Sequence, residues 1–178
     1  PSSGNYTEGQ YYGDIWGFET DRYFTEDDFN GKDADGNWIY KDGVADQTGL
    51  QSGSFVYGPG DVKFVDQNGD GKIDGGKGTV EDHGDLKVIG NALPRFEYAL
   101  RLGAAWKGFD IDVFLRGVGQ RKLWTTGSLF IPMAQSNLGV FDHQLSYNKY
   151  VVDANGNITG WEINQDNDYP NMYPGASG

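Results

Sequence analysis

The side chains with the clearest capacity for chemistry lie in a short acidic loop, residues 66–74, of sequence D-Q-N-G-D-G-K-I-D. Oxygen donors at the first, third and fifth positions can converge on one hard cation, and Gly71 permits the sharp turn that this requires. Calcium suits such a loop because it accepts six to eight oxygen ligands in flexible geometry. Protein oxygens would fill most of its coordination shell, so the ion would be structural. The predicted calcium ligands are Asp66, Asn68, Asp70, the carbonyl of Lys72, Asp74 and Asp85.

The loop departs from an EF-hand at its closing position. Position twelve is Lys77, which cannot coordinate a cation, and residues 61–65 alternate like a strand where an EF-hand has a helix. A closing carboxylate would therefore come from Glu81, Asp82 or Asp85, beyond a glycine-rich insertion. The alternative is a turn without metal, whose carboxylates are solvated.

No other group of side chains favours catalysis. His83 and His143 are the only histidines, and both are expected in exposed loops. Asp110 and Asp112 would lie about 7 Å apart on one face of a strand, which is a carboxylate pair of the kind that glycosidases use. Neighbouring arginines indicate charge balance for this pair instead. We therefore expect no enzymatic activity.

Composition bounds the class of protein. The chain has 178 residues, with 14 Lys and Arg against 26 Asp and Glu, for a net charge of −12. Such an acidic chain is a poor candidate for binding nucleic acid, which needs a basic surface. Glycine at 28 residues and aromatics at 15% are typical of strands and turns, and a Cys count of 0 excludes disulfides and thiolate metal sites. The expected fold class is all-β.

Residues 95–119 carry the clearest periodicity. Apolar and polar side chains alternate over two runs of about ten residues, joined by the two-residue turn Lys107–Gly108. Strict alternation predicts two antiparallel strands, and a tilted strand needs about 9–11 residues to cross a bilayer. The residues predicted to face lipid are Phe96, Tyr98, Leu100, Leu102, Trp106, Phe109, Ile111, Val113 and Leu115. Those predicted to face a barrel lumen are Arg95, Glu97, Arg101, Asp110, Asp112 and Arg116.

A soluble β-sandwich is the alternative, because its inner face is also apolar. The protein would then be a secreted, calcium-stabilised module for glycan binding or adhesion. Three features favour the membrane. The strands exceed the usual length of about 5–6 residues, and their polar face carries both charge signs. The turn between them is very short, as periplasmic turns are, and the segments at their other ends are long, as extracellular loops are. A second sheet packed on the apolar face would decide for the sandwich.

Three motifs follow one another along the middle of the chain. They are G-D-V-K-F-V-D-Q-N-G-D-G-K-I-D at residues 60–74, V-I-G-N-A-L-P-R-F-E-Y at residues 88–98, and W-K-G-F-D-I-D-V-F-L-R-G at residues 106–117. In type and order they resemble the SusC/RagA family of TonB-linked outer-membrane transporters. The chain departs from the family pattern at the long glycine-rich link 75–84 and at Ala99, where glycine is common.

The resemblance implies a segment of a TonB-dependent receptor: antiparallel strands of a transmembrane β-barrel with long extracellular loops. It implies location in the outer membrane of a Gram-negative cell, oligosaccharide or peptide cargo, and a SusD-like surface lipoprotein as partner. The TonB complex would contact parts of the protein outside these 178 residues. Residues 1–58 would form strands and loops, 59–94 the calcium-type loop region, 95–119 the transmembrane hairpin and 120–178 an extracellular loop. These strands would form only part of a barrel, because open sheet edges are not tolerated in lipid.

Overall fold

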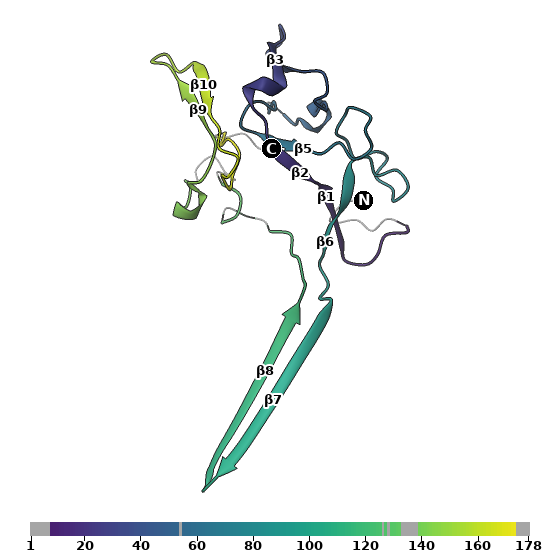
Figure 1. Ribbon diagram of the computed structural model, residues 1–178, viewed down its shortest axis with the longest axis vertical. Coiled ribbons are helices and arrows are strands. Elements are labelled where there is room, and N and C mark those ends of the chain that lie inside the picture. Colours follow the sequence, from purple (N-terminus) through teal and green to yellow (C-terminus); the bar gives the residue numbers. More distant parts are fainter. Residues whose placement is uncertain (1–7, 54, 126, 128, 133–138, 174–178) are drawn as a thin grey trace.

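The computed structural model describes residues 8–53, 55–125, 127, 129–132 and 139–173. This part of the chain is all-β with antiparallel strand pairs, as predicted, and its only helical elements are three single 3₁₀ turns at Glu26–Asp28, Thr48–Leu50 and Asp142–Gln144. Figure 1 shows a body of short strands and loops from which one long hairpin projects. The strands are β1 Asp14–Phe18, β2 Thr20–Tyr23, β3 Phe29–Lys32, β4 Trp38–Tyr40, β5 Val62–Phe64, β6 Leu86–Asn91, β7 Phe96–Trp106, β8 Phe109–Gly119, β9 Lys149–Val152 and β10 Ile158–Glu162.

The strands pair into five two-stranded sheets, and none of the sheets in the described residues closes into a barrel. Strands β1 and β2 follow each other directly along the chain; β1 pairs with β6, and β2 pairs with β5. The acidic loop connects β5 to β6. The two strands that flank this loop therefore both pair with the consecutive strands β1 and β2, which fixes the two ends of the loop.

Side-chain amides cover both open edges of the β2–β5 sheet. Gln165 accepts the Tyr23 N–H at 2.7 Å and donates to the Tyr23 carbonyl at 3.1 Å. On the opposite edge, Gln47 accepts the Phe64 N–H at 2.7 Å and donates to the Val62 carbonyl at 3.1 Å. Each glutamine thus bonds the edge as another strand would, which removes unpaired backbone groups from the sheet.

The apolar core of the body is small and mainly aromatic. Phe24 and Phe29 are buried with ring centroids 5.1 Å apart, and Tyr40 packs against both. Trp38 extends this cluster from Phe29 to Trp161 at 5.4 Å, edge to face. Strand β4 therefore connects the N-terminal part of the body to the β9–β10 hairpin by ring contacts, which are favourable in such tilted geometries.

A buried polar cluster fixes residues 171–173 to the turn that precedes β5. The Asp61 carboxylate accepts the Gly58 N–H at 2.9 Å and the Tyr173 hydroxyl at 3.0 Å, and Asn171 donates to the Pro59 carbonyl at 2.6 Å. Burial raises the pKa of Asp61 to about 7, although these hydrogen bonds act in the opposite direction. The C-terminal part of the described chain is thus fixed by polar contacts that are buried away from solvent.

Two hairpins of the body share one loop design. The loop between β3 and β4 has the sequence D-A-D-G-N, and the loop between β9 and β10 has D-A-N-G-N. In both, the aspartate Oδ1 accepts the N–H groups two and four residues on, at 2.8–2.9 Å. The β9–β10 hairpin has a five-residue loop because the Asp153 side chain organises the whole connection.

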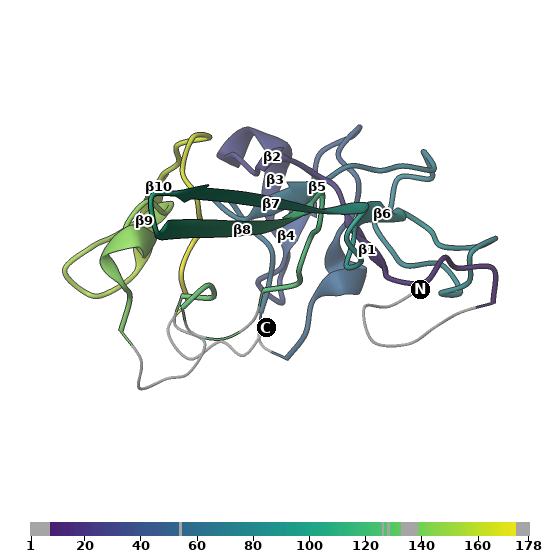
Figure 2. The ribbon, with the colours of Figure 1, turned by 90° about the horizontal axis from the view of Figure 1, so that it is seen from below.

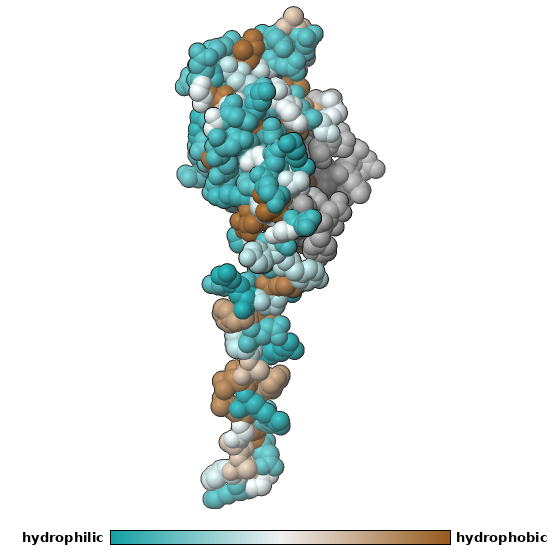
Figure 3. All heavy atoms as spheres, turned by 90° about the vertical axis from the view of Figure 1, so that its right-hand side faces the viewer, coloured by the Kyte–Doolittle hydropathy of each residue, from teal (hydrophilic) through white to brown (hydrophobic). Residues whose placement is uncertain are grey.

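The β7–β8 hairpin stands apart from the body. Figure 1 shows it extending downward as a two-stranded ribbon, and Figure 2, viewed from below, shows it projecting from the body toward the viewer. In Figure 3 brown apolar residues alternate with teal polar ones along this column, whereas the visible face of the body is mostly teal. Among the described residues, no helix has the length and apolar character needed to cross a membrane.

Candidate functional site

The register of the β7–β8 hairpin puts the two predicted sets of side chains on opposite faces of the sheet. The two strands pair over 11 residues each, from Phe96↔Gly119 to Trp106↔Phe109. Directly opposed residues lie on the same side of a sheet, so Leu102 and its partner Val113 share one face. All nine residues predicted to face lipid lie on this side. The Lys107–Gly108 turn has φ angles of 45° and 85°, the positive values that a tight two-residue hairpin requires.

This apolar face is uncovered along its whole length. Trp106 is 70% exposed, Phe109 73% and Leu102 55%, and in the described residues no other strand packs on them. At the end nearest the body, the Phe96 and Tyr98 rings lie over Gly119 and Gly117, where a Cβ would collide with them. Aromatic rings thus cover the two strand glycines, which otherwise leave gaps in the face.

The opposite face carries two ion pairs that cross between the strands. Arg101 pairs with Asp112, and Arg116 pairs with Glu97 at 2.8 Å. Four of the six residues predicted to face a lumen are therefore neutralised in pairs, while Arg95 lies just before β7 and Asp110 lies opposite Ala105. The apolar side chains Phe114 and Val118 share this face, so it is mixed in character.

The acidic loop is organised by its own carboxylates. Asp66 accepts the N–H of Gly69 at 2.6 Å and that of Gly71 at 2.9 Å. In the part of the chain that the structure describes, no three histidine, aspartate or glutamate side chains gather closely enough to hold a metal ion. The donor types suit calcium, but these oxygens engage the loop backbone, and the calcium site stays a prediction. Residues Asn68, Asp70 and Asp74 likewise each accept the N–H two positions on.

Asp85 joins the two ends of this loop. Its side chain is fully buried, with Oδ1 accepting the Gln67 N–H at 2.8 Å and Oδ2 accepting the Asp74 N–H at 2.9 Å. Ile73, between these ends, is also buried. The observed role of Asp85 is thus to hold the loop closed through its backbone, while its predicted role as an ion ligand stays a prediction.

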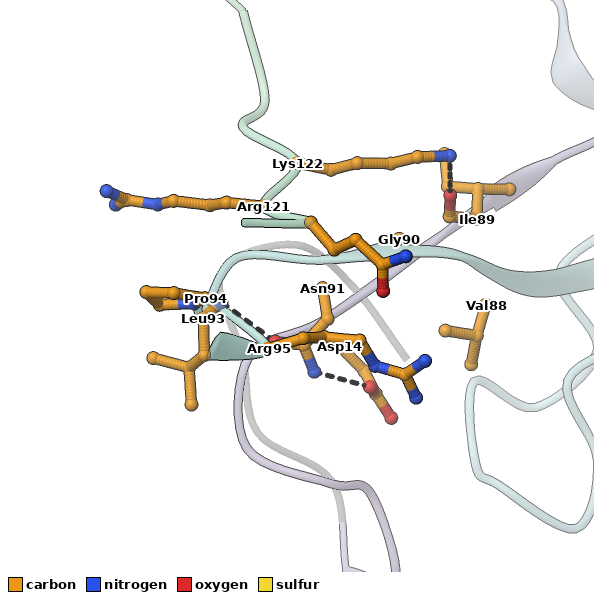
Figure 4. A pocket seen from close by; sticks show the side chains of 11 residues that line it. Asp14, Val88, Ile89, Gly90, Asn91, Leu93, Pro94, Arg95, Arg121 and Lys122 are labelled. Carbon is orange, nitrogen blue, oxygen red and sulfur yellow. Dashed lines mark hydrogen bonds between the residues drawn. The ribbon is translucent and has the colours of Figure 1, made fainter. Parts of the chain in front are cut away.

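A cavity of about 670 Å³ lies where the hairpin meets the body (Figure 4). Apolar residues Val88, Ile89, Leu93 and Pro94 line it together with three cationic side chains: Arg95, Arg121 and Lys122. Arg121 and Lys122 are not among the site residues predicted from sequence. The sequence signal for them is a local excess of basic residues. Residues 95–122 hold six of the 14 basic residues of the chain and only three of its 26 acidic residues.

Comparison with known proteins finds no similar protein. No protein-family model, no curated protein and no solved structure matches the chain. The function is therefore inferred from the geometry of the hairpin and from the sequence motifs.

Proposed function

We propose that this chain forms part of the barrel wall and extracellular loops of an outer-membrane active transporter of the SusC/RagA type. The transporter would import oligosaccharides or peptides, take its energy through TonB, and work with a SusD-like surface lipoprotein. In this proposal β7 and β8 are two adjacent wall strands, and the body lies outside the membrane.

The uncovered apolar face of the hairpin is the observation that carries this proposal. Removing one Val, Leu, Ile or Phe side chain from water contributes about 1.5–3 kcal/mol. For the seven such residues on this face the total is on the order of 10 kcal/mol, which is comparable to the stability of a whole domain. A face of this kind is stable only against hydrocarbon or against another protein layer.

The hairpin dimensions favour hydrocarbon. Eleven residues at about 3.3 Å each extend about 36 Å, and at a tilt of about 40° they cross the apolar layer of an outer membrane. The sandwich alternative requires a second sheet over Leu102 and Val113, and no described strand packs there. The paired charges on the other face suit a water-filled interior, where charged side chains need no burial.

Uptake measurements on cells carrying the gene that contains this segment test the proposal. We expect deletion of the gene to abolish uptake of at least one member of a panel of labelled oligosaccharides and short peptides. Removal of TonB should abolish the same uptake while cargo still binds at the cell surface. Uptake that persists without TonB, or protein that fractionates away from the outer membrane, would refute the transporter.

Calcium binding by the acidic loop is a separate prediction of the same proposal. Replacing Asp66 and Asp70 by asparagine should abolish the heat of calcium binding in a calorimetric titration of chelator-treated protein at millimolar calcium. The matched control is the pair Asp33→Asn and Asp35→Asn in the similar D-A-D-G-N loop, which should leave that heat unchanged. Absence of calcium heat in the unmodified protein would remove the ion from the proposal.

A further inference from the structure

The cationic side chains of the hairpin segment concentrate at its ends. Residues 95–122 carry a net charge of +3, although the whole chain carries −12. Two of the six cations are neutralised by the pairs Arg101–Asp112 and Arg116–Glu97. Lys107 lies at the turn, with its ammonium 4.8 Å from the Trp106 ring centroid. The remaining three cations all lie at the base of the hairpin.

These three basal cations line the cavity between hairpin and body. Arg95 immediately precedes β7, and Arg121 and Lys122 follow β8 after a single residue, Gln120. No ion pair with a described residue involves any of the three. Asp14 is the one acidic residue among the lining side chains. The cavity therefore combines an apolar wall with an excess of positive charge.

Backbone contacts fix two of these cations in place. Lys122 Nζ donates to the Ile89 carbonyl at 2.6 Å, and Arg121 Nε donates to the Ala92 carbonyl at 2.9 Å. The Lys122 stem lies against Gly90, where an added Cβ would come within 2.9 Å of the lysine Cβ. Figure 4 shows Arg121 and Lys122 extending in opposite directions from adjacent positions of the chain, so their charged ends lie apart.

We propose that this cavity binds the phosphate-bearing headgroup of an anionic lipid. The inference rests on the proposed function, which places the base of the hairpin at the bilayer surface. There the apolar face ends at Phe96, and headgroup phosphates lie at the level of Arg95, Arg121 and Lys122. Guanidinium and ammonium groups bind phosphate oxygens strongly, so these three side chains suit an anionic headgroup.

The test compares two lipids on the full-length protein purified in detergent. Native mass spectrometry with added phosphatidylglycerol or phosphatidylcholine reports which lipid stays bound. We expect phosphatidylglycerol to be retained about tenfold or more over phosphatidylcholine. The triple variant Arg95→Gln, Arg121→Gln and Lys122→Gln should lose this preference. The charge-matched control Lys32→Gln, Lys41→Gln and Lys149→Gln on the body should keep it.

The outcomes separate the headgroup site from the transporter. Equal retention of both lipids by the unmodified protein, or a triple variant with unchanged preference, would overturn the headgroup site and leave the membrane hairpin standing. Displacement of phosphatidylglycerol by equimolar inorganic phosphate would make this a site for free phosphate, which also overturns the proposal. Retention of neither lipid would likewise overturn the headgroup site, whereas the proposed function is tested separately by uptake and by fractionation with the outer membrane.

Discussion

Replacing Leu102 by arginine should strongly reduce the amount of this protein that assembles in the outer membrane. Leu102 lies near the middle of β7 and faces Val113, on the apolar side of the hairpin. An arginine facing lipid at the bilayer midplane costs about 2–4 kcal/mol, which is a factor of roughly 30 to 1,000 in an equilibrium. The measurement is the amount of full-length protein in the outer-membrane fraction of a density gradient, detected with an antibody.

The neighbouring position offers a matched control. Gly103 lies one residue on, faces Asp112 on the polar side, and has room for a side chain, since a Cβ there would meet only the Ile111 carbonyl oxygen at 3.9 Å. Gly103→Arg adds the same charge at the same depth and should assemble nearly normally, because on the polar face the new side chain stays in water. Asp110, diagonal to it on that face, makes no ion pair with a described residue. Equal loss in both variants, or no loss with Leu102→Arg, would argue against a lipid-facing side.

Replacing Asp28 by alanine should destabilise the body by about 3 kcal/mol or more. The Asp28 side chain is buried. It accepts one N–H from each terminal nitrogen of the Arg22 guanidinium, at 2.6 and 2.7 Å, together with the Thr25 N–H at 2.8 Å. Lys63 lies 3.6 Å from the same carboxylate. Loss of this carboxylate removes the partner that both cations share and leaves Asp21, 3.6 Å from Lys63, as the remaining counter-charge. Removing one member of a buried pair in this way is the costly way to break it.

The pH dependence of unfolding gives a second readout for the same residue. Burial alone would raise the pKa of Asp28, but hydrogen bonds from Arg22 and Thr25 outweigh it and lower the pKa to about 2, from an ordinary value of 3.8. A lowered carboxyl pKa stabilises the fold above the unfolded value, and this stabilisation is lost as the pH falls from about 4 to about 2. The Asp28→Ala variant should not show this loss of stability between about pH 4 and about pH 2.

Chemical denaturation followed by tryptophan fluorescence measures both effects, because Trp38 packs on Phe29 directly beside this cluster. Asp27 is the matched control, since it is the adjacent residue, is also acidic, and is exposed. Asp27→Ala should change the free energy of unfolding by no more than about 0.5 kcal/mol. A stability of Asp28→Ala equal to that of Asp27→Ala would show that the buried pair contributes little.

The sequence by itself determined the elements that depend only on residues close together along the chain. The β7–β8 hairpin follows from strict alternation and from a turn that tolerates positive φ, and both are properties of consecutive residues. The five-residue hairpin loop at 153–157 is similarly local, because one aspartate side chain satisfies the N–H groups of its own turn. Alternation also assigns each side chain to one of the two hairpin faces, because successive residues of a strand point to opposite sides.

Tertiary structure alone decided the strand pairing within the body and which polar side chains are buried there. The pairing of β1 with β6 joins residues more than 60 positions apart, and short irregular strands carry no periodicity that would reveal it. Gln47, Asp28 and Asp85 are residue types that are mostly exposed in proteins, yet here they are buried. Gln47 and Asp85 are buried because backbone groups 11 to 18 residues away supply their hydrogen bonds. Asp28 lies between Arg22 and Lys63, two cations that the pairing of β2 with β5 brings together. Such partners are set by how the chain folds back on itself.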